Sequence, residues 1–99
     1  MNIIETRNDN VITLQIEGRI DTNTSAVFQN DILKSFQKVN NLILDFEKCV
    51  YASSAGLRAL LIGQKTADSK KGTMKLINVP DVLMSVLEMT GFVNILNIE

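Results

Sequence analysis

Residues 42–63 read LILDFEKCVYASSAGLRALLIG, an apolar run that is followed, after two serines, by a helical pattern. Leu42–Phe46 is short, apolar and flanked by polar residues, which is typical of an inner strand of a sheet. The apolar residues after Ser54 recur at helical spacing and predict a helix from Ala55 to about Lys70. A strand that leads into a helix in this way is typical of α/β proteins.

The residues before this segment predict a pair of strands. Ile3–Thr6 and Val11–Glu17 have strand patterns. Along the second of them, positions expected to be buried alternate with positions expected to be more exposed to solvent. Asn8-Asp9-Asn10 separates the two, and such side chains tolerate left-handed backbone angles, so we expect a hairpin. Gly18 and Asp21 are expected to end the second strand, and Thr24 or Ser25 can cap the helix that follows.

Four further elements complete the predicted fold. Phe28, Ile32 and Phe36 recur every four residues and predict an amphipathic helix. Pro80 suits the first turn of a later helix and Gly91 its end. The four elements are a helix over Ala26–Lys38, a strand over Met74–Ile77, a helix between Pro80 and Gly91 and a strand over Ile95–Ile98. The order ββαβαβαβ predicts a single α/β domain over residues 1–99, with a mixed β-sheet packed with α-helices.

Charge and residue content exclude several classes of function. Ten Lys and Arg residues balance eleven Asp and Glu residues to a net charge of −1, which argues against nucleic-acid binding through bulk electrostatics. The chain has no His and one Cys, Cys49. Neither a His-dependent catalytic triad nor a Cys-rich zinc site can therefore be built from one chain, and we expect no metal.

No membrane insertion is expected. The longest strongly apolar run, Ala59–Ile62, is far shorter than the roughly 20 residues that a membrane helix needs. The first residues lack the basic and apolar regions of a secretory signal. We therefore expect a cytoplasmic protein.

Ser53 and Ser54 are the leading candidates for a functional site. They place two hydroxyls at the start of a helix, where free backbone N–H groups and the helix dipole favour negative charge. A serine at this junction can be a phosphoacceptor. Alternatively it only caps the helix, since Ser is among the preferred capping residues, and the two roles are compatible.

The helix after Ser54 carries a candidate docking surface. At 100° per residue one arc is expected to face the sheet. The other arc combines small side chains with one larger apolar side chain, which is a pattern that a partner protein could pack against. A phosphate on the adjacent serine would oppose such packing and so switch the complex off. This second arc consists of Ala55, Arg58, Ala59, Ile62 and Thr66. Elsewhere Asp21, Asp45 and Glu47 show no paired acid/base spacing, and Cys49 has no neighbour that would activate its thiol.

Several of these segments together resemble the STAS family (sulfate transporter and anti-sigma factor antagonist). Leu44-Asp45-Phe46 and Tyr51–Leu61 resemble its central motif, Gly18–Asp21 resembles the turn after its second strand, and Leu87–Phe92 resembles the end of its third helix. The matches follow the same order over nearly the whole chain. The resemblance implies the STAS fold.

Free-standing members of this size are typically anti-sigma factor antagonists. The resemblance implies that the unphosphorylated chain binds an anti-sigma factor serine kinase and so releases the sigma factor. Phosphorylation then separates the complex, and a serine phosphatase restores the antagonist. The family's acceptor position corresponds to Ser54, and Asp21 matches an acidic residue near it. ATP belongs to the kinase, so the chain is expected to be a substrate rather than an enzyme, with no cofactor and no small-molecule substrate of its own.

Two departures from the family pattern surround this acceptor. Ser53 replaces a frequent Asp and offers an alternative acceptor, while Ala55 replaces a frequent Ser or Thr. Ser54 remains the first choice for the phosphoacceptor. The alternative function is a STAS adaptor subunit of a lipid-transport ABC system that is never phosphorylated, for which the same helix surface would serve. A small enzyme using Asp21 and Ser54 is disfavoured because neither a His nor a metal-ligand set is available.

Overall fold

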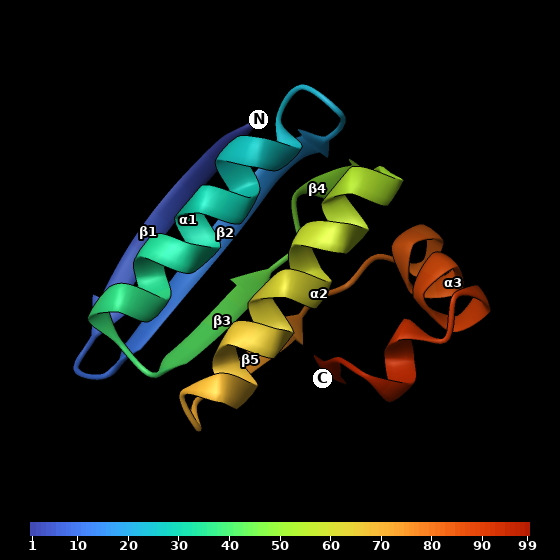
Figure 1. Ribbon diagram of the computed structural model, residues 1–99. Helices are drawn as coiled ribbons and strands as arrows, with labels where there is room; N and C mark the ends of the chain where they lie inside the picture. Colours follow the sequence, from blue (N-terminus) through green and yellow to red (C-terminus); the bar gives the residue numbers. More distant parts are fainter.

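The computed structural model covers residues 1–99 and contains one mixed β-sheet and three α-helices (Figure 1). Its strands are β1 (Asn2–Asn8), β2 (Val11–Ile20), β3 (Asn41–Asp45), β4 (Cys49–Ala52), β5 (Thr73–Ile77) and β6 (Asn97–Ile98). Its helices are α1 (Ser25–Lys38), α2 (Ser54–Ser69) and α3 (Asp81–Met89), followed by the short 3₁₀ helix η1 (Phe92–Asn94). The predicted α/β class with a mixed sheet is confirmed.

The sheet begins with the expected hairpin. β1 and β2 are antiparallel, Asn8 lies opposite Val11, and Asp9 between them has a left-handed φ of 55°. The remaining neighbours in the order β1-β2-β3-β5-β6 are parallel. Parallel neighbours require crossovers, which α1, α2 and α3 supply.

The predicted order ββαβαβαβ is wrong in one element, because it lacks β4. β2 does not end at Gly18; it continues to Ile20 and pairs in parallel with β4, with Arg19 opposite Tyr51. The register shifts at Gly18, where φ is +97°, a conformation that suits glycine. The bend lets one long strand pair first with β3 and then with β4. The last predicted strand, Ile95–Ile98, is also shorter and covers only Asn97–Ile98, because the N–H groups of Ile95 and Leu96 donate to the Phe92 carbonyl of η1.

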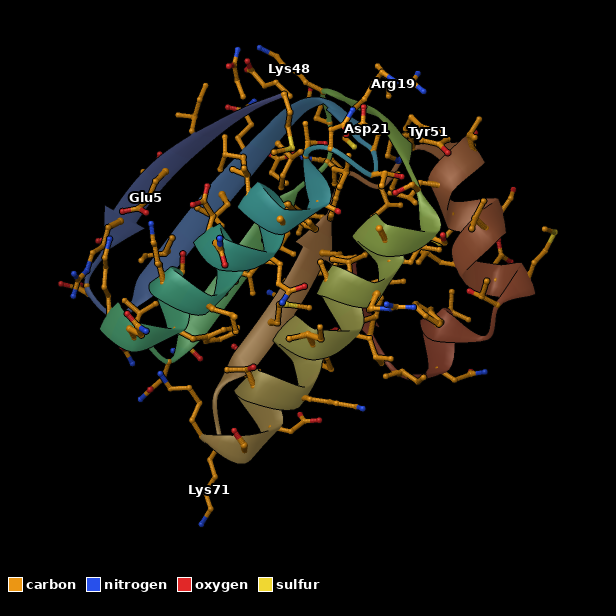
Figure 2. All side chains as sticks on the ribbon, turned by 45° about the horizontal axis from the view of Figure 1, so that its top comes forward. Glu5, Arg19, Asp21, Lys48, Tyr51 and Lys71 are labelled. Atoms are coloured by element: carbon orange, nitrogen blue, oxygen red, sulfur yellow. The ribbon has the colours of Figure 1, made fainter.

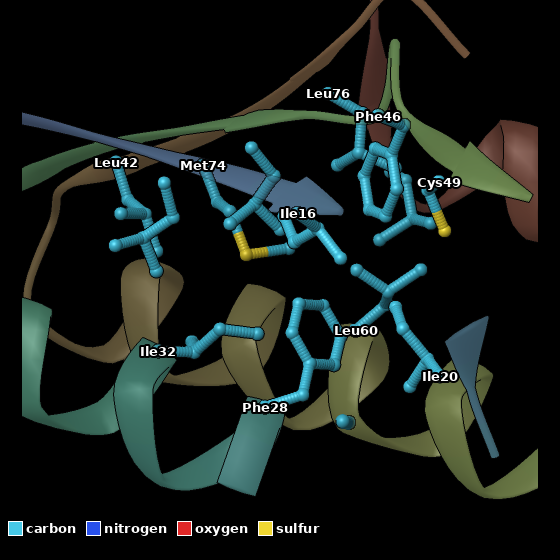
Figure 3. Packing of buried hydrophobic residues seen from close by; sticks show 14 of the residues in the cluster. Ile16, Ile20, Phe28, Ile32, Leu42, Phe46, Cys49, Leu60, Met74 and Leu76 are labelled. Atoms are coloured by element: carbon cyan, nitrogen blue, oxygen red, sulfur yellow. The ribbon is translucent and has the colours of Figure 1, made fainter. Parts of the chain in front are cut away.

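The hydrophobic core lies between the sheet and two helices on one of its faces. α1 and α2 run side by side over the strands, and α3 lies beside α2 near the C-terminus (Figure 1). Alternate residues of β3 and β5 are buried on this face, as period-two alternation requires. Phe28 of α1 and Leu60 of α2 enter the same core (Figure 3). The Phe28 and Phe46 rings meet edge to face, with centroids 6.4 Å apart.

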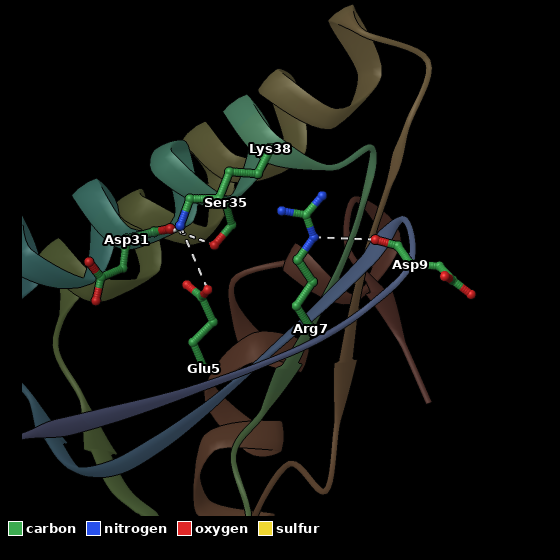
Figure 4. Close-up of polar contacts among 6 residues, drawn as sticks. All are labelled: Glu5, Arg7, Asp9, Asp31, Ser35 and Lys38. Carbon is green, nitrogen blue, oxygen red and sulfur yellow. Dashed lines mark hydrogen bonds and ion pairs between the residues drawn. The ribbon is translucent and has the colours of Figure 1, made fainter.

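Polar contacts of α1 contribute little to its position, because the ion pair that joins it to β1 is exposed and the bond of the buried Ser35 hydroxyl stays within the helix. Lys38 Nζ lies 3.7 Å from Glu5 Oε2 of β1, and the Ser35 hydroxyl donates to the Asp31 carbonyl (Figure 4). Exposed ion pairs of this kind typically contribute under about 1 kcal/mol. Burial of Phe28 and Ile32 therefore holds α1 on the sheet. No helix in the structure combines the length and the apolarity needed to cross a membrane.

Candidate functional site

The two serines where β4 leads into α2 have different surroundings. Ser53 has extended backbone angles and is the N-cap of α2; its Oγ accepts a hydrogen bond of 3.3 Å from the Gly56 N–H. Ser54 is the first residue of the helix, and its side chain is exposed and makes no hydrogen bond within the chain. The capping role therefore belongs to Ser53, and the Ser54 hydroxyl is free for another role.

The end of β2 holds this junction in place. The Ser53 N–H donates to the Ile20 carbonyl at 2.8 Å, directly after the paired residues Ile20 and Ala52. Gly56 lies against Ile20, and a Cβ at Gly56 would be 2.8 Å from Ile20 Cγ2. The glycine after the serines thus allows the first turn of α2 to approach β2 closely.

Asp21 stabilises the turn that leaves β2 beside this junction. Its Oδ1 accepts from the N–H groups of Asn23 at 2.9 Å and Thr24 at 3.0 Å. The Thr24 hydroxyl lies 3.1 Å from the same Oδ1 and 3.0 Å from the Arg19 carbonyl. Hydrogen bonding, foremost from the Thr24 N–H, lowers the pKa of Asp21. This carboxylate is already used within its own turn, which accounts for its presence there independently of any partner.

An exposed cation–aromatic pair lies at the same end of the molecule. The Arg19 guanidinium carbon is 4.4 Å from the centroid of the Tyr51 ring. Arg19, Asp21 and Tyr51 gather at this end, whereas Lys71 lies at the opposite end (Figure 2). No local sequence pattern indicates the Arg19–Tyr51 pair, because the pair depends on the pairing of β2 with β4.

The predicted docking arc of α2 needs one correction. Ala59 is fully buried, so the expectation that it lies on an exposed arc is wrong. Ala59, Gly63 and Lys70 lie along one line of the helix, and Gly63 and Lys70 contact Ile32 and Phe36 of α1. This side of α2 therefore faces α1. Among the other predicted residues Arg58 is exposed, while Ser53, Ala55, Ile62, Thr66 and Asp21 are half-buried.

A small apolar cavity lies between β4 and α3. Its volume is about 90 Å³, and seven of its eight lining residues are hydrophobic. Val50 of β4 and Val82 of α3 both line it and are 69% and 76% exposed, so the cavity lies next to an apolar surface. Val50 and Val82 are far apart in the sequence, and no local pattern connects them.

The remaining candidates have structural roles. The Asp45 carboxylate accepts from the Glu47 N–H at 3.0 Å and from Asn78 Nδ2 at 3.1 Å, and so joins two turns. Cys49 is buried, and burial raises the pKa of its thiol, which makes it a poor nucleophile. No group of three or more His, Cys, Asp or Glu residues is arranged to hold a metal ion.

Comparisons with known proteins agree with this fold. The family model described as "STAS domain" matches residues 2–99. The anti-sigma-B factor antagonist of Bacillus subtilis is 24% identical over 99 residues, which span the whole of this chain and 91% of that protein. The crystal structure of an anti-sigma factor antagonist from Mycobacterium paratuberculosis has a TM-score of 0.86 at 16% identity and covers 98% of this chain and 83% of its own. The structure of the Bacillus cell fate determinant SpoIIAA in its phosphorylated form has a TM-score of 0.79 at 17% identity. It covers 99% of this chain and 91% of its own.

Proposed function

The chain belongs to the STAS domain family, and we propose that it is an anti-sigma factor antagonist controlled by phosphorylation of Ser54. In this proposal the unphosphorylated chain binds an anti-sigma factor serine kinase and thereby releases the sigma factor. Phosphorylation separates the two proteins, and a serine phosphatase restores the antagonist. The chain is the substrate of these reactions and is not itself an enzyme.

The observation that carries this proposal is the difference between Ser53 and Ser54. A kinase needs an acceptor hydroxyl that is exposed and free of other bonds, and Ser54 meets both conditions while Ser53 is used as the cap. The B. subtilis relative, an anti-sigma-B factor antagonist, supports the class of partner, and the phosphorylated form of SpoIIAA supports this type of control.

The proposed phosphorylation uses ATP that is bound by the kinase. Ser54 Oγ attacks the γ-phosphorus, a new O–P bond forms, and the bond between the γ-phosphorus and the bridging oxygen breaks to release ADP. A base of the kinase takes the hydroxyl proton. The phosphatase reverses the modification by hydrolysis, and water and phosphoserine give serine and inorganic phosphate.

The change in charge explains how the modification would end binding. A phosphate adds about −1.5 to −2 charges at neutral pH. Ser54 lies beside the uncharged residues Ala52 and Ala55, so a partner packed here would bury part of that charge. Desolvating a net negative charge that the partner does not neutralise costs free energy and opposes the complex.

Substitutions of Ser54 test this mechanism. Binding should be measured by calorimetry against each anti-sigma factor serine kinase of the source organism, produced singly. We expect Ser54→Asp to weaken binding by at least about tenfold, which corresponds to 1.4 kcal/mol, and Ser54→Ala to preserve it. Ser53→Ala is the matched control: it should cost about 1 kcal/mol of stability through the lost cap but leave the acceptor in place. If Ser54→Asp and Ser54→Ala both bind like the unmodified chain, the proposal is wrong.

Phosphorylation should also be mapped by mass spectrometry on protein purified from its native cells, with a Ser54→Ala strain as control. We expect a phosphopeptide at Ser54 that is lost in that strain. Its absence across growth and stress conditions would favour the adaptor of a lipid-transport ABC system instead.

A further inference from the structure

Arg58 is an exposed cation without a partner, one helical turn after Ser54. It belongs to α2 and takes part in none of the ion pairs of the structure, which join Lys38, Lys48 and Lys75 to glutamates. Between Ser54 and Gln64 it is the one charged residue. No carboxylate on its own helix is therefore within reach at a spacing of three or four residues.

We propose that Arg58 binds the phosphate on Ser54 in an ion pair along α2, an inference that rests on the proposed phosphorylation of Ser54. The first turn of the helix is regular, since the Leu57 N–H donates to the Ser53 carbonyl at 3.0 Å. Residues at i and i+4 differ by about 40° around a helix, and their Cβ atoms are about 6 Å apart. The phosphate and the guanidinium thus lie on the same exposed side.

The chemistry of the pair favours its formation. Guanidinium groups bind phosphate oxygens through two parallel hydrogen bonds, and an anion that precedes a cation by four residues is the better orientation on a helix. The other arginine at this end, Arg19, already contacts the Tyr51 ring, and the Asp21 carboxylate is already hydrogen bonded within its turn. Arg58 is therefore the cation on α2 that is placed and free to take the phosphate.

This pair would give phosphorylation a second effect on binding. In the unphosphorylated chain Arg58 is available to a carboxylate of the partner. In the phosphorylated chain the same guanidinium is held by the phosphate four residues earlier. Phosphorylation would then both add negative charge and withdraw a cation from the contact.

Phosphorus NMR on the whole chain tests the pair directly. Phosphoserine is incorporated at position 54 during translation, so no kinase is needed, and the midpoint of the second phosphate ionisation is measured in roughly 0.1 M salt. Because the cation favours the dianion, Arg58→Gln should raise this midpoint by about 0.3 pH unit, and Arg58→Lys should restore most of the difference. In roughly 1 M salt, which screens exposed charges, the difference should disappear.

Lys65→Gln is the matched control. It removes one exposed cation from the same helix, but it lies about 16 Å along the axis from Ser54, beyond the screening length of about 10 Å. We expect it to leave the midpoint unchanged. The proposed ion pair between Arg58 and the phosphate would be overturned by either of two results. One is an equal midpoint for the chain with Arg58 and the Arg58→Gln variant, and the other is the same rise for Lys65→Gln. This readout does not depend on whether cells phosphorylate Ser54, so failure of the pair and failure of the proposed function are separate results.

Discussion

Ser53 and Ser54 show how neighbouring residues of one type acquire different roles. Ser53 has extended backbone angles, which direct its Oγ to the Gly56 N–H, whereas Ser54 is already helical and directs its hydroxyl to solvent. Asp21 is a comparable case, because its carboxylate is held by the Asn23 and Thr24 N–H groups of the adjacent turn. At each position the local backbone decides which polar atoms remain available to a partner.

The turn at Asp21 makes stability depend on pH. Hydrogen bonding lowers the pKa of this carboxyl in the folded chain, so its stabilising effect is complete above the ordinary Asp range and is lost as the pH falls through the lowered pKa. Asp21→Asn cannot titrate. We expect the difference in urea midpoint between the two chains to be constant above roughly pH 5 and to shrink in more acidic solution. A difference that does not vary with pH would contradict this account.

At the scale of the elements, the position of α2 depends on its contacts with β2 and α1. Its first turn lies against Ile20 through Gly56, and its middle lies against Ile32 through Gly63. Two small residues therefore set how closely this helix approaches its neighbours. Close packing on the α1 side also explains why Ala59 is buried although the exposed Arg58 precedes it directly in the predicted arc.

Gly56→Ala should therefore destabilise the fold. The added methyl group would lie 2.8 Å from Ile20 Cγ2 in the core, and overpacking of this kind typically costs about 1–3 kcal/mol. The higher helix propensity of Ala, about 1 kcal/mol, offsets part of this cost. The net effect is a loss of up to about 2 kcal/mol in the free energy of unfolding, measured in urea titrations followed by circular dichroism. A variant more stable than the original chain would show that this contact relaxes freely.

At the scale of the whole molecule, Lys70 connects the ends of α1 and α2. Its Nζ donates to the carbonyl oxygens of Phe36 and Val39, the latter at 3.0 Å, and lies 5.6 Å from the centroid of the Phe36 ring. The cation thus satisfies carbonyl groups at the end of α1, where the helix dipole is negative. This one side chain joins two helices that are separated by β3 and β4 in the sequence.

Lys70→Met tests this connection, because Met retains much of the aliphatic length but cannot donate. We expect the free energy of unfolding to fall by about 2 kcal/mol, the range for hydrogen bonds to charged groups. Lys71→Met is the control, since the Lys71 side chain points into solvent (Figure 2). Equal losses in both variants would show that removal of a positive charge, rather than the bond to α1, causes the effect.

The sequence by itself determined most of the helices and strands, the hairpin and the serine junction. These features depend on hydrophobic periodicity, turn residues and helix caps, which act over a few neighbouring residues. β4 was not predicted, because its four residues have no alternating pattern and form a strand only by pairing with the end of β2. Only the tertiary structure decided that Ala59 is buried, that Lys70 binds α1 and that a cavity separates β4 from α3. Each of these depends on contacts between segments that are distant in the chain, and local patterns do not encode them.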